Sequence, residues 1–68
     1  MMYIAKIDGK AVHIYEAVTG AYVRVISTGY VPLTAVCQGE ILSLRCDDGK
    51  TYIFNVKKGE YIRTICWW

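Results

Sequence analysis

The chain states one pattern twice, as IYEAVTGAYVRVI at residues 14–26 and as IFNVKKGEYIRTI at residues 53–65. An isoleucine, a glycine, a tyrosine and an arginine recur at one spacing, because 53 − 14, 59 − 20, 61 − 22 and 63 − 24 all equal 39. In both stretches, β-branched and aromatic residues flank a short turn that ends in glycine. This pattern is typical of a hairpin whose last turn residue is left-handed. The repeat therefore predicts two similar β units within 68 residues.

The rest of the sequence extends this pattern to one all-β domain, residues 1–68. Turn residues such as Asp8-Gly9 separate short apolar runs, and no segment has the period of an amphipathic helix. We predict seven short antiparallel strands, at residues 2–7, 12–17, 21–27, 33–38, 41–46, 51–56 and 61–68. Three lie in a first repeat (1–28) and four in a second (33–68), joined by a linker (29–32). A small β-barrel is the alternative arrangement.

Size and composition predict self-association. A domain of this length buries a modest fraction of its surface, yet 54% of the residues are hydrophobic and the mean hydropathy is +0.25. Apolar side chains that the small interior cannot hold are ordinarily covered at a subunit interface. We therefore expect a homo-oligomer.

The three cysteines, Cys37, Cys46 and Cys66, show neither disulfide nor metal spacing. Their number is odd, no CxxC pair occurs, and His13 is the only histidine. We expect buried free thiols, a reducing cytoplasmic location, and no metal or other cofactor.

Charge and hydropathy bear on two other partners. No apolar run is long enough for a membrane span, so no membrane association is expected. Six tyrosines among eight basic residues leave open an alternative function, a small β-barrel that binds single-stranded nucleic acid. Acidic residues share the turns with the lysines and weaken any continuous positive track.

Residues 33–65 resemble one blade of the WD40-like or quinoprotein-like β-propellers. The matching elements are the Asp48-Gly49-Lys50 turn, YIFN ending at Asn55, the glycine turn at Gly59, and YIRTI at residues 61–65. The period of about 40 residues is also that of a blade. The Trp-Asp dipeptide and quinone-ligand signatures are absent, so the resemblance implies a scaffold and no activity.

The same resemblance implies how the chain would be completed. Small two-blade propellers close by assembling three chains into six blades, which favours a trimer. The first repeat has no counterpart of residues 33–38, the inner strand of a blade. We expect another copy of the chain to complete it.

Two Tyr-Arg pairs are the candidate ligand site: Tyr22 with Arg24, and Tyr61 with Arg63. Strand alternation would place each pair on one face, where it can stack on and hold an anion, a sugar or a base. The structural alternative, which we prefer, is that the arginine stems cover apolar surface.

Trp67 and Trp68 are the candidate interface residues. Tryptophan is enriched at interface hot spots, so we expect subunit packing, with partner binding or a frayed tail as alternatives.

No catalytic constellation is visible. His13 and Glu16 fall on opposite faces of one strand, and neither a nucleophile elbow nor a phosphate-binding glycine loop occurs. We therefore expect no enzyme but an oligomeric binding or scaffold protein that recognises a small molecule or a protein. Its size would suit an accessory protein, for example of a phage or prophage. An enzyme whose site is shared between subunits is the least favoured alternative.

Overall fold

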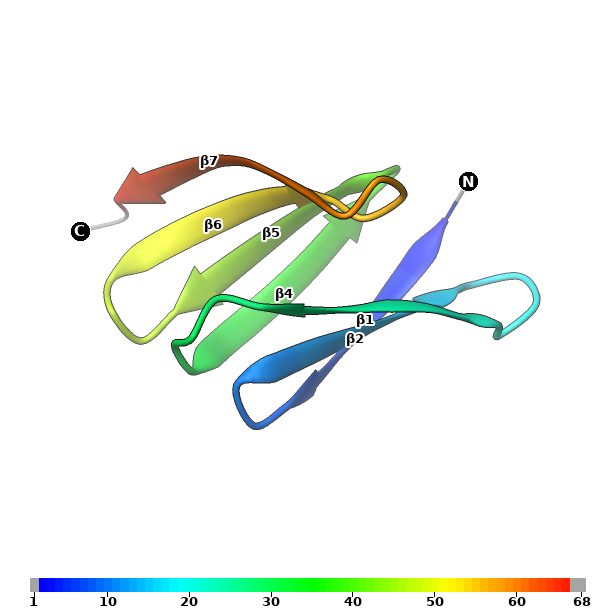
Figure 1. Ribbon diagram of the computed structural model, residues 1–68, viewed down its shortest axis with the longest axis horizontal. Coiled ribbons are helices and arrows are strands. Elements are labelled where there is room, and N and C mark those ends of the chain that lie inside the picture. The colour runs from blue at the N-terminus through cyan, green and yellow to red at the C-terminus, as the bar shows by residue number, and fades with distance from the viewer. Residues whose placement is uncertain (1, 67–68) are drawn as a thin grey trace.

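The computed structural model describes residues 2–66, which form seven antiparallel β-strands (Figure 1). They are β1 (Tyr3–Asp8), β2 (Ala11–Glu16), β3 (Tyr22–Ser27), β4 (Pro32–Gln38), β5 (Ile41–Cys46), β6 (Lys50–Asn55) and β7 (Glu60–Cys66). The predicted all-β class with three plus four strands is confirmed. The described part of the chain has no helix that could span a membrane.

The strands form two separate sheets, one of order β1-β2-β3 and one of order β4-β5-β6-β7. β1 lies beside β4 where the sheets meet, but no strand ladder joins them within residues 2–66 (Figure 1). The alternative of a small closed barrel is therefore wrong. Pro32 is the first residue of β4, a position where a missing N–H is tolerated.

The repeat extends to the pairing register of the two outer hairpins. Between β2 and β3, Ile14 pairs with Arg24 and Tyr15 with Tyr22, so that Val23 is an extra residue. The β6–β7 ladder shifts at the equivalent place, between Ile53 and Phe54. A β-bulge thus occurs at the same position in both repeats.

The turns that close these hairpins are also equivalent. The Gly20 amide donates to the Glu16 carbonyl at 2.8 Å, and the Gly59 amide donates to the Asn55 carbonyl at 2.7 Å. Both glycines are left-handed, with φ of 76° and 72°. The predicted glycine-closed turns are confirmed, and a residue with a Cβ would be strained at either position.

Each sheet has two faces that we name by the repeat. The front face carries the shared isoleucine, Ile14 or Ile53, and the back face carries the aromatic residue that follows it, Tyr15 or Phe54. Because side chains alternate along a strand, cross-strand partners share a face. Ile26 therefore belongs to the front face of the three-stranded sheet, since it pairs with Val12.

The core lies between the front face of the three-stranded sheet and the back face of the four-stranded sheet. Among residues 2–66, the buried hydrophobic residues are Tyr3, Val12, Ile14, Ile26, Leu42, Leu44, Cys46 and Val56. Leu42 and Leu44 belong to the back face because they pair with Phe54 and Tyr52. Full burial of an aliphatic side chain contributes about 1.5–3 kcal/mol. The sheets thus stack with the front face of one against the back face of the other.

Candidate functional site: two exposed sheet faces

Front-to-back stacking leaves one face of each sheet exposed. The chain has fourteen exposed large hydrophobic residues within residues 2–66, against eight buried ones. Six of the fourteen lie on the strands of the two exposed faces: Ile4, Tyr22, Val25, Val36, Ile41 and Ile65. Apolar side chains gathered on a protein surface mark an interaction site.

The exposed back face of the three-stranded sheet centres on an aromatic cluster. The ring of Tyr22 lies 5.6 Å from that of Tyr15, edge to face, and 5.9 Å from that of His13. His13 Nδ1 is 3.5 Å from the Tyr22 hydroxyl, and His13 Nε2 is 3.5 Å from an Asp8 carboxylate oxygen. This cluster offers an amphipathic surface with apolar rings and polar tips.

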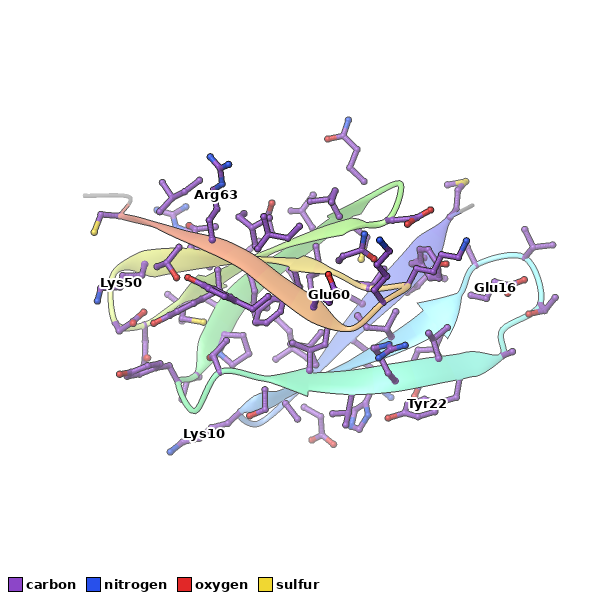
Figure 2. All side chains as sticks on the ribbon, turned by 45° about the horizontal axis from the view of Figure 1, so that its top comes forward. Lys10, Glu16, Tyr22, Lys50, Glu60 and Arg63 are labelled. Atoms are coloured by element: carbon purple, nitrogen blue, oxygen red, sulfur yellow. The ribbon has the colours of Figure 1, made fainter. Side chains whose placement is uncertain are left out.

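The exposed front face of the four-stranded sheet combines isoleucines with one arginine. Ile65 is 49% exposed and pairs with Thr51, and Ile53 pairs with Arg63. Figure 2 shows the Arg63 side chain pointing away from the three-stranded sheet, while Tyr22 lies at the opposite side of the molecule. The two exposed faces therefore look in opposite directions.

The expectation that each tyrosine shares a face with its arginine is wrong. Tyr22 pairs with Tyr15 on the back face, but Arg24 pairs with Ile14 on the front face. The bulge causes this separation, because the extra residue between them reverses the alternation of side chains. Tyr61 and Arg63 are separated in the same way. No Tyr-Arg stack therefore exists in either repeat, and the predicted ligand-binding role of these residues stays a prediction.

Arg24 ties the two sheets together. From the front face of the three-stranded sheet, its Nη2 donates to the Lys57 carbonyl at 2.9 Å, in the turn between β6 and β7. The guanidinium lies directly over Gly59, where an added Cβ would collide with it. The buried Arg24 Nε has no hydrogen-bond partner within the described chain. Arg24 therefore has a structural contact between the sheets, while the expectation that its stem covers apolar surface stays a prediction.

Arg63 has no such contact. No ion pair or hydrogen bond joins its side chain to another of residues 2–66, and the side chain is exposed. The neighbouring Tyr61 shares a hydrogen bond with the Thr64 hydroxyl. The two equivalent arginines thus differ in their contacts: the Arg24 side chain donates to a carbonyl of the other repeat, and the Arg63 side chain makes no hydrogen bond within residues 2–66.

His13 and Glu16 do not form an acid–base pair. Glu16 Oε1 accepts a hydrogen bond from the Thr19 hydroxyl at 3.3 Å, whereas His13 contacts Asp8 and Tyr22. The expected opposite orientation of these two residues is confirmed, since Glu16 pairs with Tyr3 and His13 pairs with Lys6.

The cysteines occupy three different environments and are free. Cys46 is buried and Cys37 is half-buried, and desolvation raises the pKa of both thiols. Buried thiols acting as small hydrophobic residues fit these two positions. Cys66 is exposed, so the expectation of three buried thiols is wrong for it.

Sequence reasoning missed one polar contact. The Tyr52 hydroxyl donates to the Asp48 carboxylate at 2.5 Å, and the Tyr52 ring stacks on Tyr30 from the linker at 6.2 Å. The hydrogen bond to Asp48, followed by desolvation, raises the pKa of Tyr52. The spacing of four residues across a hairpin turn was the available signal.

No enclosed site accompanies these faces. Within residues 2–66 there is no pocket and no cluster of three metal-ligating side chains. The predicted interface residues Trp67 and Trp68 lie outside the described residues. In the comparisons with known proteins, no family model, no curated protein and no solved structure matches the chain.

Proposed function

We propose that this protein is a non-enzymatic binding and scaffold module that works as an assembly of copies of itself. One observation carries the proposal: among residues 2–66, exposed large hydrophobic residues outnumber buried ones, and six of the fourteen lie on two opposite sheet faces. Burying apolar surface is the main driving force of association, so such faces favour a macromolecular partner.

The propeller resemblance supplies the proposed form of the assembly. Each sheet is a blade, and three chains supply six blades around a common axis. Both blades use a bulge and a left-handed glycine at equivalent positions, which supports treating them as copies of one unit. A small-molecule or protein ligand would then bind where blades of different chains meet, in a cytoplasmic setting.

The ligand-binding residues proposed from sequence fit this arrangement better between chains than within one. Tyr22 and Arg63 lie on the two exposed faces, which look in opposite directions within one chain (Figure 2). Stacking one copy on another brings a face that carries Tyr22 against a face that carries Arg63. A ligand site that uses both side chains would therefore require assembly.

The solution mass tests the proposal. Multi-angle light scattering on the full chain is expected to give a multiple of 7.7 kDa, with three chains as the favoured number. A mass of one chain at all concentrations would overturn the proposed function. The alternative of nucleic-acid binding is tested on the same sample by adding a single-stranded oligonucleotide at low and high salt.

A further inference from the structure

We infer that the exposed front face of the four-stranded sheet binds the exposed back face of the three-stranded sheet of a second copy, and that Arg63 donates to the Val18 carbonyl across this contact. The inference rests on the proposed function and names the surfaces that would carry it. Its basis is the contact that the two repeats of one chain already make.

The interior of the chain shows how one repeat packs on another. The front face of the three-stranded sheet lies on the back face of the four-stranded sheet, and Ile14, Ile26, Leu42 and Leu44 are buried between them. Because both sheets face the same way, the back face of the three-stranded sheet is exposed on one side of the molecule and the front face of the four-stranded sheet on the other. Within the chain, a front face already packs on a back face.

The arginine contact can be transferred residue by residue. Within the chain, Arg24 donates to the Lys57 carbonyl over Gly59. Because the repeat is 39 residues, the partners of Arg63 (24 + 39) would be the carbonyl of Val18 (57 − 39) and the space over the glycine at position 20 (59 − 39).

The two groups that this contact would join, the Arg63 side chain and the turn that contains Val18 and Gly20, are both exposed in the described structure. The Arg63 side chain is exposed and makes no hydrogen bond within residues 2–66. Val18 is 84% exposed, and a Cβ added at Gly20 would meet nothing within 4 Å. A guanidinium can therefore approach this turn as Arg24 approaches the turn at Gly59.

The apolar residues of the two exposed faces also correspond to those of the buried contact. Ile53 and Ile65 stand where Ile14 and Ile26 stand in the first repeat. On the opposite face, Ile4, Tyr15 and Tyr22 are equivalent to Leu42, Phe54 and Tyr61.

Where the exposed faces differ from the buried faces, the exposed faces carry the more polar residues. On the front face, Thr51 and Arg45 stand where Val12 and Ile7 stand in the first repeat. On the back face, His13 and Lys6 stand where Tyr52 and Leu44 stand in the second repeat. A surface that contacts water before assembly is expected to be more polar than a domain core.

The proposed interface joins two different surfaces, which has a consequence for symmetry. Such head-to-tail contacts generate rings when the rotation closes, whereas two-fold dimers use the same patch on both copies. A substitution on either face should therefore block assembly, and two copies damaged on opposite faces should still pair.

The decisive experiment mixes two matched variants of the full chain. Ile65→Asp damages only the exposed front face and Val25→Asp damages only the exposed back face; these side chains are 49% and 50% exposed, so both variants should fold. Circular dichroism checks folding. Each variant alone is expected to be monomeric by light scattering, because an unpaired charge is costly to bury. An equimolar mixture is expected to form a 1:1 heterodimer and nothing larger.

A second measurement tests the arginine contact itself. Arg63→Ala is expected to raise the dissociation constant about tenfold or more, the usual effect of losing one charge-assisted hydrogen bond. Lys58→Ala is the matched control, since it removes the same charge from an exposed turn and should leave the constant within about twofold.

The outcomes separate the two proposals. If the wild-type chain assembles but the mixture stays monomeric, or if only one variant loses assembly, the front-to-back interface is overturned and the self-assembling scaffold stands. Equal effects of the Arg63 and Lys58 substitutions would overturn the Val18 contact. A wild-type chain that stays monomeric overturns the proposed function together with this inference.

Discussion

Arg24 and Arg63 occupy the same place in two copies of one pattern, yet only Arg24 contacts a carbonyl oxygen within residues 2–66. The difference comes from surroundings: Arg24 faces the turn of the other repeat, whereas Arg63 lies on an exposed face. Surroundings act on Tyr52 in the same way, since its hydrogen bond to the Asp48 carboxylate raises the pKa of its hydroxyl. At the scale of a residue, the neighbour determines the chemistry.

The raised pKa of Tyr52 predicts a pH-dependent contribution to stability. The folded state holds this proton more tightly than the unfolded state, so the contribution is complete below about pH 10, the ordinary tyrosine pKa. It declines as the pH rises from there through the raised value of the folded state. Tyr52→Phe should therefore be less stable than wild type at pH 8, by a margin that shrinks above pH 10. Urea unfolding at several pH values measures the margin.

Asp48→Asn is the matched variant for this measurement. It keeps the shape of the side chain and an oxygen acceptor for the Lys50 amide, but removes the carboxylate that raises the pKa of Tyr52. Its margin relative to wild type should shrink over the same pH range. A margin that stays constant from pH 8 to above pH 10 for both variants contradicts the prediction.

At the scale of the element, the bulge and the glycine-closed turn act as one device. The bulge turns Arg24 to the face opposite Tyr22, and the turn at Gly59 leaves room for its guanidinium. Each feature has a counterpart in the other repeat: the bulge recurs at Ile53/Phe54 in the second, and the left-handed glycine turn recurs at Gly20 in the first. A hairpin of this type therefore carries an arginine hydrogen-bond donor on its last strand and, in its turn, a carbonyl acceptor close to a glycine.

Replacement of Gly59 should cost more than replacement of an ordinary turn glycine. Gly39 is the control, because it is also left-handed (φ 60°) and a Cβ there meets nothing within 4 Å. Gly39→Ala should cost about 1–2 kcal/mol for the backbone conformation alone. Gly59→Ala should cost about 2–4 kcal/mol, because the Arg24 hydrogen bond is lost as well. Chemical unfolding measures both.

A double-mutant cycle measures how much of the cost of Gly59→Ala comes from Arg24. In an Arg24→Ala background, the cost of Gly59→Ala should fall to that of Gly39→Ala, because the colliding guanidinium is gone. Additive costs would show that Arg24 and Gly59 are independent and would contradict the contact.

At the scale of the whole molecule, front-to-back stacking leaves two unlike faces exposed and gives the chain a small core of eight buried hydrophobic residues among those described. A domain of this size draws limited stability from its own core. Assembly would supply the remainder, since a partner that binds only the folded state stabilises it by mass action.

Stability should accordingly depend on protein concentration. The free energy of unfolding is expected to rise by about 1.4 kcal/mol per tenfold rise in concentration above the dissociation constant, for each partner bound. Thermal unfolding at about 5 and 500 μM would show this as a higher melting temperature in the concentrated sample. Val25→Asp, which is expected to be monomeric, should melt at one temperature throughout. An unchanged wild-type melting temperature would contradict the prediction.

The sequence by itself determined the secondary structure and the repeat. Alternating apolar residues and left-handed glycines such as Gly20 and Gly59 depend on local backbone geometry, so all seven strands were predictable to within one residue wherever both limits are described. The two-sheet division followed from the linker at Pro32.

Only the tertiary structure decided which faces are buried. A one-residue bulge at Val23 reverses side-chain orientation without leaving a clear mark in the sequence, so Tyr22 and Arg24 separate against expectation. The sense of stacking also depends on contacts between residues far apart in the chain, such as Arg24 with Lys57. Equivalent residues in two similar motifs therefore acquired different environments, because burial is a property of the packed sheets and not of the motif.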